Sequence, residues 1–372
     1  HGASVFRAGA GIYTGRFPYA IYSDAAQFGP AGNATVTFDD ATGGAPGLGQ
    51  GPAPAELQQR RDLLPAREIR QTFALGLQQP TGYQGTLGYA VQLGDKWAIS
   101  LDGVIVDTRH LPRSFDLNPI TRPLTPSDTV DRTVAFGDPL RPVTPVTGSY
   151  RRLTTTESGG RSRYLGLYVS VRRRLSASWA LDANWVWSRA RNDTEDINFN
   201  AVAGNDYAAE YADAANDRRH RVTLRSVSTI ARRIRLGVIG DFQTGQPVNR
   251  VAGTINADGS VAFRDLDGSG GIFGEGFIGS HDRFPGVPRN GERLPSFFNL
   301  GTSVTYLLAL GGNALEVRAD AFNLLNGTEW AGFATGLPGG GSRTQVGRPG
   351  DPIVLRAAGP PRQIQFSATY RF

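Results

Sequence analysis

The stretch Gln363-Ile-Gln-Phe-Ser-Ala-Thr-Tyr-Arg-Phe372 closes the chain and alternates polar and apolar side chains without interruption. Because successive side chains of a β-strand point to opposite faces, this stretch has one apolar and one polar face. The apolar face carries Ile364, Phe366, Ala368, Tyr370 and Phe372. Such a strand belongs either at the edge of a soluble sheet or in a sheet whose apolar face meets lipid.

Six further segments show the same period of two, with aromatic and β-branched residues on one face. They are Trp97–Val106, Tyr164–Arg172, Trp179–Ser188, Ile234–Phe242, Phe298–Leu308 and Leu315–Asp320. In the last segment Glu316, Arg318 and Asp320 all lie opposite the apolar face. This separation favours a lipid-facing sheet, because a charged side chain at the bilayer midplane costs about 2–4 kcal/mol.

Composition excludes several classes of protein. The 372 residues have a mean hydropathy of −0.28 and contain no apolar run near 18 residues, so a transmembrane helix is not expected. A membrane-spanning sheet is compatible with this hydropathy, because only every second residue faces lipid. The chain contains no Cys, which excludes disulfides and zinc-thiolate sites.

The net charge of +6 comes almost entirely from arginine, since Lys96 is the only lysine. These arginines are spread along the chain and form no cluster with interleaved aromatic residues, so nucleic acid is not an expected partner. Arginine forms bidentate pairs with phosphates and carboxylates. We therefore expect outer-membrane lipid and lipopolysaccharide as partners, together with a small-molecule or oligomeric solute.

The connections between the predicted strands alternate between short and long. Tight turns occur at Gly94–Lys96, Leu175–Ala177, Ala231–Arg232 and Gly311–Asn313, and long stretches at 108–160, 190–217, 245–295 and 326–361. Bacterial outer-membrane barrels have short periplasmic turns and long outer loops, whereas a soluble sandwich has more uniform connections. The sequence predicts an all-β fold, an antiparallel transmembrane β-barrel of about ten strands. The first strand lies near residues 3–14 and the last at 362–372, with the C-terminus periplasmic.

One segment does not fit this alternation. Glu68–Leu77 is compatible with a strand or with a short helix, because Ile69, Phe73 and Leu77 are spaced by four residues. A strand here breaks the up-and-down order. We therefore expect a helix inside an outer loop spanning roughly residues 15–82.

Four motifs carry a resemblance to a known family. They are Arg109–Pro119, Asn216–Arg221, Asp282–Asn290 and Ala321–Asn326. Together with the terminal Tyr370-Arg-Phe372, they resemble the C-terminal barrel half of TonB-dependent outer-membrane receptors. The closest resemblance is to the Oar-like branch, which carries a carboxypeptidase-regulatory-like domain. The resemblance implies a 22-stranded barrel with a plug, which imports a scarce solute with energy relayed through the TonB complex.

The resemblance also implies that residues 1–372 are the C-terminal part of such a barrel. The plug, the TonB box and the N-terminal barrel strands are then expected upstream, because the chain is already strand-like from Ala3. The implied solute is an iron chelate, an oligosaccharide or a peptide. Two alternatives remain open, a plugless diffusion porin and a surface adhesion or structural barrel. The expected location is the bacterial outer membrane.

Several residues follow as candidates for function. The residues expected to line the lumen are Arg172, Arg235, Glu316, Arg318, Asp320 and Arg371. The residues expected to form the membrane-insertion signal at the end of the chain are Phe366, Tyr370 and Phe372. No catalytic residue and no cofactor is expected, because no Gly-x-Ser-x-Gly motif occurs and no Ser is marked out as a nucleophile beside a His. His110, His220 and His281 lack the spacing of a metal site.

Asp265-Leu-Asp-Gly-Ser-Gly270 is a weak calcium candidate. Asp265, Asp267 and Ser269 stand at positions one, three and five of a calcium loop, and Gly270 stands at position six. Position twelve should be a bidentate acid, yet it is Gly276, and Glu275 comes one residue early. The alternative is a polar, glycine-rich turn without metal.

Two motifs have direct physical interpretations. The Asp and Arg side chains of Asn216–Arg221 form either an ion-pair network at the lumen or rim, or a solvated strand end. The asparagines of Phe322–Asn326 are expected to cap a turn through their own backbone.

Overall fold

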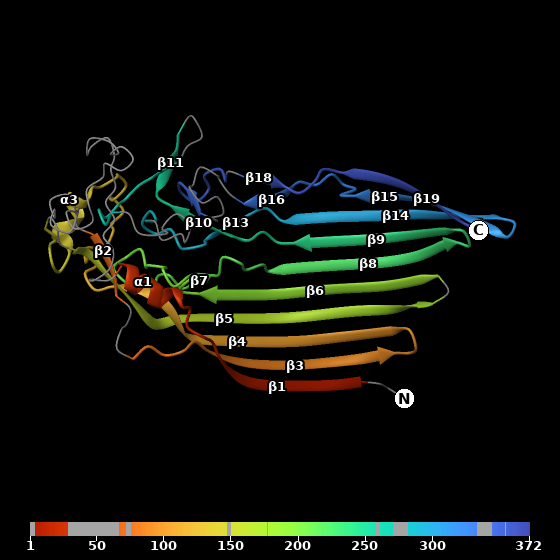
Figure 1. Ribbon diagram of the computed structural model, residues 1–372, viewed down its shortest axis with the longest axis horizontal. Coiled ribbons are helices and arrows are strands. Elements are labelled where there is room, and N and C mark those ends of the chain that lie inside the picture. The colour runs from red at the N-terminus through yellow and green to blue at the C-terminus, as the bar shows by residue number, and fades with distance from the viewer. Residues whose placement is uncertain are drawn as a thin grey trace, which may run out of the picture.

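The computed structural model describes residues 4–28, 67–71, 76–146, 150–176, 178–256, 261–270, 282–332, 344–353 and 355–372. Ten strands form one antiparallel sheet, shown in Figure 1. Across the sheet they are β1 (Ser4–Thr14), β3 (Thr81–Leu93), β4 (Trp97–Asp116), β5 (Tyr150–Ser176), β6 (Trp179–Asn192), β8 (His220–Ala231), β9 (Ile234–Gln243), β14 (Phe297–Leu310), β15 (Asn313–Phe322) and β19 (Gln363–Arg371). The prediction of about ten antiparallel strands is confirmed. Among the described residues β1 and β19 are the two edges, so the sheet is not closed.

Tight turns join the strands at one end of the sheet, on the right in Figure 1. The β3–β4 and β14–β15 turns contain Gly94 and Gly311, whose φ angles of 60° and 64° favour glycine. β1 begins and β19 ends at this same end. The long connections all lie at the opposite end, as the alternation of short and long segments predicts.

The strand register produces two continuous faces. One row of paired residues runs through Leu101, Val169, Trp185, Val222, Phe242 and Phe298. A row on the other face runs through Arg172, Asp182 and Arg225. We call these the apolar face and the polar face, and every segment with period-two alternation contributes to both in the predicted sense.

No second layer covers the apolar face in the part of the chain that the structure describes. Phe366 on β19 is 76% exposed, Phe6 on β1 is 67% exposed, and Leu87 on β3 is 56% exposed. A soluble protein rarely leaves such a large continuous apolar surface in water. Hydrocarbon is the solvent that this face matches. None of the helices in the described ranges is long and apolar enough to cross a membrane.

The long connections fold together beyond the loop end of the sheet into a region that we call the cap, comprising the described residues of 117–149, 193–219 and 244–296, residues 344–353, and α1. Its elements and the small strands beside it are α1 (Ala20–Phe28), β2 (Arg67–Gln71), α3 (Val134–Gly137), the 3-10 helix η3 (Asp138–Leu140), β7 (Ala212–Asp213), β10 (Pro247–Val251), β11 (Gly253–Ile255), β12 (Val261–Phe263), β13 (Glu292–Arg293), β16 (Glu329–Gly332), β17 (Thr344–Val346) and β18 (Leu355–Ala358). Three small sheets result, β13-β10-β17, β11-β12 and β16-β18.

The cap has only a small apolar core, formed by Ala252, Leu266 and Phe284. Many of its most deeply buried side chains are instead charged, including Arg250, Arg289 and Glu210. Buried charges are tolerated where they are paired and hydrogen-bonded. Polar contacts therefore determine the shape of the cap.

The helix expected at Glu68–Leu77 is wrong for the part that the structure describes. Residues Arg67–Gln71 form β2, which pairs in parallel with β5 where that strand extends beyond the apolar face. Backbone hydrogen bonding to β5 therefore decides the structure of this segment, although the four-residue spacing of its apolar side chains favours a helix. The loop does contain a helix, α1, at Ala20–Phe28. Residues 72–75 lie outside the described ranges.

The two faces predict opposite solvent exposure for adjacent residues. Because the chain has no cysteine, Val169→Cys and Ser170→Cys each accept a single nitroxide label. We expect oxygen, which concentrates in hydrocarbon, to relax the label at position 169, and a water-soluble nickel complex to relax the label at 170. Electron paramagnetic resonance in bilayers measures both effects. Equal nickel accessibility at the two positions would contradict a lipid-facing sheet.

Candidate functional site

All six residues expected to line the lumen lie on the polar face. Arg172 is on β5, Arg235 on β9, and Glu316, Arg318 and Asp320 on β15, while Arg371 is on β19. All except Arg371 line a trough of about 1090 Å³ on this face. Their role toward a solute remains a prediction, but the structure places them together.

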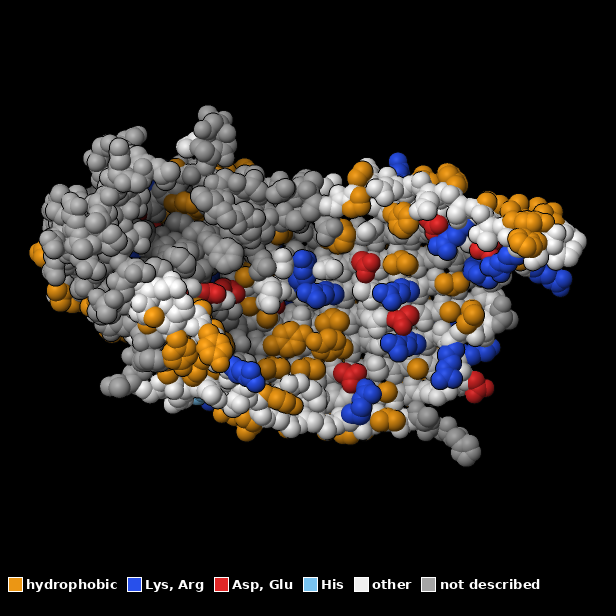
Figure 2. Space-filling view, viewed as in Figure 1, with side chains coloured by type: hydrophobic (Ala, Val, Ile, Leu, Met, Phe, Trp, Pro, Cys, Tyr) orange, Lys and Arg blue, Asp and Glu red, His pale blue; other side chains and the backbone are white. Residues whose placement is uncertain are grey.

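Ion pairs cross the polar face from strand to strand. Arg172 pairs with Asp182 at 3.1 Å, Arg7 with Asp102 at 2.9 Å, and Arg371 with Glu316 at 3.3 Å. A further pair, Arg318–Asp320 at 2.7 Å, joins two residues of β15. Figure 2 shows Lys/Arg and Asp/Glu side chains interleaved across the strands.

Four arginines that line the trough, Arg173, Arg174, Arg225 and Arg235, make no ion pair with any residue that the structure describes, and Arg173 lies against Trp97 and Trp179 instead. Arg225 and its neighbour Asp182 were missed as candidates, although both follow the same period-two pattern. The trough therefore offers free guanidinium groups, which suit anionic groups such as carboxylates or phosphates.

The cap contains a second concentration of charge, centred on Arg289. The guanidinium of this residue, which is 2% exposed, donates hydrogen bonds to the Glu195 carboxylate at 3.0 Å and to the Asn192 side-chain oxygen at 2.7 Å. It also donates to the backbone oxygen of Glu210 at 2.8 Å, and Arg283 pairs with the Glu210 carboxylate at 2.5 Å. These contacts join two long connections to the end of β6.

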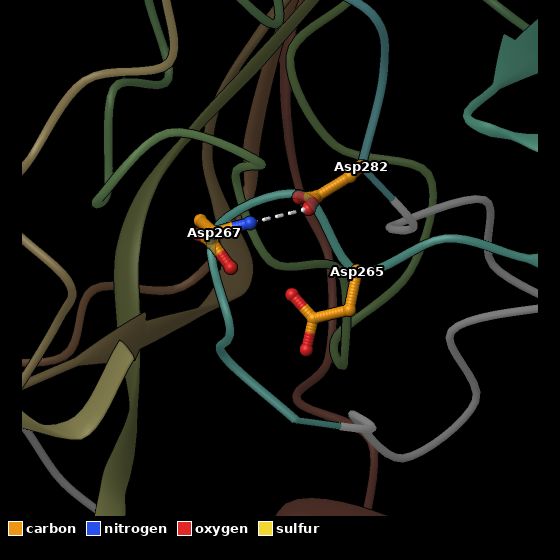
Figure 3. A group of neighbouring side chains, drawn as sticks. All are labelled: Asp265, Asp267 and Asp282. Carbon is orange, nitrogen blue, oxygen red and sulfur yellow. Dashed lines mark hydrogen bonds between the residues drawn. The ribbon is translucent and has the colours of Figure 1, made fainter. Parts of the chain in front are cut away.

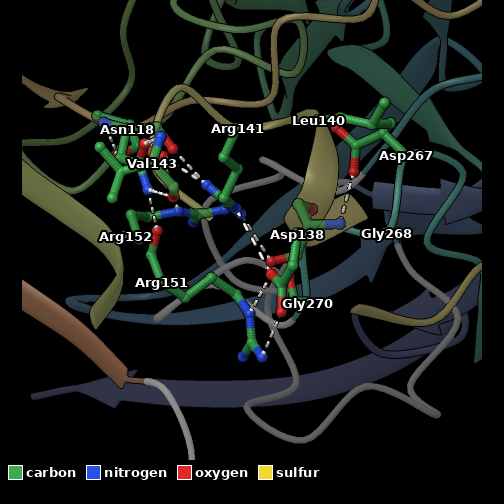
Figure 4. A network of polar contacts seen from close by, with 12 residues as sticks. Asn118, Asp138, Leu140, Arg141, Val143, Arg151, Arg152, Asp267, Gly268 and Gly270 are labelled. Carbon is green, nitrogen blue, oxygen red and sulfur yellow. Dashed lines mark hydrogen bonds and ion pairs between the residues drawn. The ribbon is translucent and has the colours of Figure 1, made fainter. Parts of the chain in front are cut away.

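A neighbouring network joins the ends of β4 and β5 to the cap (Figure 4). Arg141 donates to the backbone oxygen of Asn118 at 2.6 Å and pairs with Asp116 at 3.3 Å. Arg152 pairs with the same Asp116 at 3.4 Å, and Arg151 pairs with Asp138 at 2.7 Å. Because Asp116 and Arg152 belong to the main sheet, the cap is attached to the sheet through charge.

Three of the four sequence motifs meet in these networks. Arg109–Pro119 supplies Asp116, and Asp282–Asn290 supplies Arg283 and Arg289. Asn216–Arg221 supplies Asp217, which is 2% exposed and accepts hydrogen bonds from the Ala190 amide and from Arg293. Of the two interpretations given for that motif, the structure shows the ion-pair network.

The fourth motif forms a turn, as expected. Asn323 has a positive φ of 48°, and its side-chain oxygen accepts a hydrogen bond from the Gly327 amide at 2.9 Å. The Asn326 side-chain oxygen accepts a hydrogen bond from the Arg362 amide at 3.0 Å, which ties this turn to the start of β19.

The calcium candidate forms a tight turn in which Asp282 joins Asp265 and Asp267, as Figure 3 shows. The Asp265 carboxylate accepts hydrogen bonds from the amides of Gly268, Ser269 and Gly270. Burial, followed by the nearby Asp265 carboxylate, raises the pKa of Asp267 to about 6. Carboxylate oxygens are suitable calcium ligands, but backbone amides already satisfy this turn. Calcium therefore remains the weaker prediction, and positions 272–276 of the loop lie outside the described residues.

The two described histidines do not come together. His110 sits at a register shift in β4 with a positive φ of 61°, and His220 stacks on Trp185, whose indole nitrogen donates to it at 3.2 Å. His281 lies outside the described ranges.

A sheet with an uncovered apolar face, tight turns at one end and long loops at the other defines the outer-membrane β-barrel class. A family model described as "Outer membrane beta barrel domain" matches residues 1–365. The chain belongs to this family, which is not an enzyme family and which locates the protein in the outer membrane. A search of curated proteins finds no match.

Several solved structures are similar to the chain. The outer membrane transporter YddB from Escherichia coli is 11% identical, with a TM-score of 0.45, covering 84% of this chain and 36% of the transporter. A mutant of the ferric enterobactin receptor PfeA from Pseudomonas aeruginosa is 13% identical, with a TM-score of 0.47, covering 99% of this chain and 38% of the receptor. The chain thus spans little more than a third of the length of either protein.

The Arg289 network predicts a large stability difference between two arginine substitutions. Arg289→Met leaves Glu195 and Asn192 without their buried partner, so we expect the cap to lose about 3–5 kcal/mol of stability. Arg172→Met removes an exposed ion pair and should cost at most about 1 kcal/mol. Native-state proteolysis of the cap measures both. Similar small losses in the two variants would show that the network does not hold the cap together.

A pH dependence follows from Asp128 in the cap. Hydrogen bonds from Arg122 and then from Thr125 lower the pKa of this carboxyl from its usual 3.8 to about 2. Because the folded pKa lies below the unfolded value, the stabilisation is complete above about pH 4 and is lost as pH falls toward 2. Proteolysis of the cap across this range should show the loss in the parent protein. In Asp128→Asn the dependence should be weaker, and an unchanged dependence would contradict this assignment.

Proposed function

We propose that the chain is the C-terminal part of the barrel of a TonB-dependent receptor of the Oar-like branch. In this proposal the barrel imports a scarce solute, such as an iron chelate, an oligosaccharide or a peptide. The observation that carries the proposal is the pairing of a lipid-facing side with a charged trough on the opposite face, below a cap built from the motifs that resemble this family.

The two free edges of the sheet support a larger barrel. Unpaired backbone groups on β1 and β19 are costly in hydrocarbon, so both edges need a partner, and the proposal assigns them further strands of the same barrel. Additional strands widen the barrel, and the proposal fills the wide lumen with a plug. Residues 1–372 are proposed to be one part of this assembly, with the plug and the TonB box on upstream segments.

The proposed orientation follows the length of the connections. The tight turns and Phe372 face the periplasm, and the cap faces the outside, where it is the first part to meet the solute. Phe366, Tyr370 and Phe372 lie on the apolar face or at its end and act as the insertion signal in this proposal. Outer-membrane lipid, lipopolysaccharide and the TonB complex are the proposed partners.

Within the trough, Arg225 and Arg235 are proposed to attract anionic groups of the solute. The neighbouring Arg172 and Arg318 are paired with acids, whereas Arg225 and Arg235, like Arg174, make no ion pair with any described residue. Iron chelates with carboxylate groups and acidic oligosaccharides fit this electrostatic pattern better than neutral sugars do.

A transport experiment tests the proposal. Cells that depend on the full-length protein for uptake of a candidate iron chelate should lose uptake when TonB is deleted or the inner membrane is de-energised. Arg225→Gln with Arg235→Gln should lower uptake of an anionic chelate several-fold and leave uptake of a neutral one unchanged. Single cysteines placed at Ala208 and Asp95 provide a control for orientation, because an impermeant maleimide on intact cells should label only the first.

The two alternatives give different results in the same system. A diffusion porin admits small sugars in liposome swelling and keeps its uptake without energy. An adhesion barrel passes no solute in either assay. Energy-independent uptake would therefore replace the receptor proposal with the porin, and the absence of any uptake would favour the adhesion barrel.

A further inference from the structure

Five arginines gather on the apolar face of the sheet, next to its apolar residues at the loop end. We call them the rim arginine cluster, and they are Arg109 on β4, Arg161 and Arg163 on β5, and Arg189 and Arg191 on β6. Strand alternation places them on the side that carries Ile105, Leu165 and Trp187. Ile105 pairs with Leu165, and Leu165 pairs with Arg189, so apolar and charged residues are direct neighbours.

Asp107, which lies on the same face, pairs with Arg109 at 3.1 Å and neutralises that member of the cluster. The other acids near the cluster lie closer to other arginines. Asp213 lies 2.7 Å from Arg219 and 2.9 Å from Arg293, but 3.6 Å from Arg189 and 4.0 Å from Arg191.

Arg161 and Arg163 are also incompletely neutralised. Asp193 lies 3.1 Å from Arg113 and 3.7 Å from Arg161. Arg163 makes no ion pair with any described residue. The cluster therefore keeps an excess of positive charge on the lipid-facing side.

The cluster surrounds a hollow of about 580 Å³ lined by Arg109, Arg161, Arg163, Ser158, Gly160 and Tyr211, among others. The guanidinium groups of Arg161 and Arg191 each lie 4.4 Å from the centre of the Tyr211 ring. Cation–π contact with one ring holds both groups in place before any ligand arrives. The hollow is thus a preorganised basic concavity at the boundary of the apolar face.

The turn end of the same strands is different. Arg173 is the outward arginine there on β4–β6, and its guanidinium lies against the rings of Trp97 and Trp179. Aromatic residues with few charges are typical of a membrane boundary that needs no specific lipid. The contrast indicates that the two ends of the sheet meet leaflets of different chemistry.

We propose that the rim arginine cluster binds the phosphorylated headgroup of a glycolipid in the outer leaflet. The guanidinium forks pair with its phosphates, and its acyl chains lie over Ile105, Leu165 and Trp187. The headgroup of a zwitterionic phospholipid carries a positive charge of its own, so its attraction to five arginines is weak. A glycolipid headgroup with two phosphates can pair with several arginines at once. This inference rests on the proposed function for the outward orientation of the loop end.

Lipid retention by the full chain tests the inference. The protein is purified in detergent, mixed with bis-phosphorylated lipid A in micelles, and the retained lipid is counted by mass spectrometry. We expect Arg161→Gln with Arg163→Gln to lower retention at least tenfold. Arg7→Gln with Arg221→Gln, which removes the same charge from the polar face, should change it less than twofold. Equal retention in the two double variants would overturn the site.

Further lipids distinguish the source of binding. If dephosphorylated lipid A is retained as well as lipid A, contact with the acyl chains alone accounts for binding, and the inference is overturned. Equal retention of phosphatidylglycerol overturns the assignment to a glycolipid, and displacement by millimolar inorganic phosphate overturns the assignment to lipid.

Two controls separate misfolding and transport from lipid binding. Arg161→Lys with Arg163→Lys keeps the positive charge and should therefore keep part of the lipid retention. This variant tests the site even if the glutamine variant does not fold. Solute uptake is measured separately, so lost retention with normal energy-dependent uptake leaves the proposed function intact.

Discussion

Hydrocarbon offers no hydrogen-bonding partner to a peptide group, and this constraint explains the main sheet. Each strand from β3 to β15 pairs on both sides, which satisfies its backbone within the protein. Once the strands are paired, the alternation of side chains separates lipid-facing from lumen-facing residues automatically. The charged residues of β9 and β15 then lie on one side together with Arg172 of β5, and most aromatic and branched residues lie on the other. The environment on each side of the sheet, lipid or lumen, rather than packing in a protein core, determines which residue types occur on each face.

Beyond the lipid the physical problem changes. The long connections are rich in Gly, Pro and Asp, and the buried apolar cluster that they form is small, so much of what holds them in place is polar. Arginine replaces the core, because one guanidinium bonds several distant segments at once, as Arg289 and Arg141 do. Burying charge is expensive, but these groups have several partners each, which offsets the desolvation. The benefit is a specific arrangement of loops that have little regular structure.

The main sheet was predictable because side-chain direction in a strand depends only on local sequence. The alternation in Trp97–Val106 or Gln363–Phe372 assigned each residue to its face without knowledge of any partner. Local reasoning failed at Glu68–Leu77, because pairing with β5 depends on a segment about eighty residues away. It also could not match Arg289 with Asn192 and Glu195, which are 97 and 94 residues distant. The neighbourhood of Asp282 with Asp265 likewise comes from the fold and not from spacing.

The length of β4 and β5 has a mechanical consequence. Both strands continue well past Ile105 and Leu165 and enter the networks of Asp116 and Arg152 without a flexible linker. Because no flexible linker separates the cap from β4 and β5, a force on the cap is transmitted directly to the main sheet. The register shift at His110 interrupts the regular pairing of β4 with β5, so the ribbon bends and twists locally between its lipid-facing part and the cap.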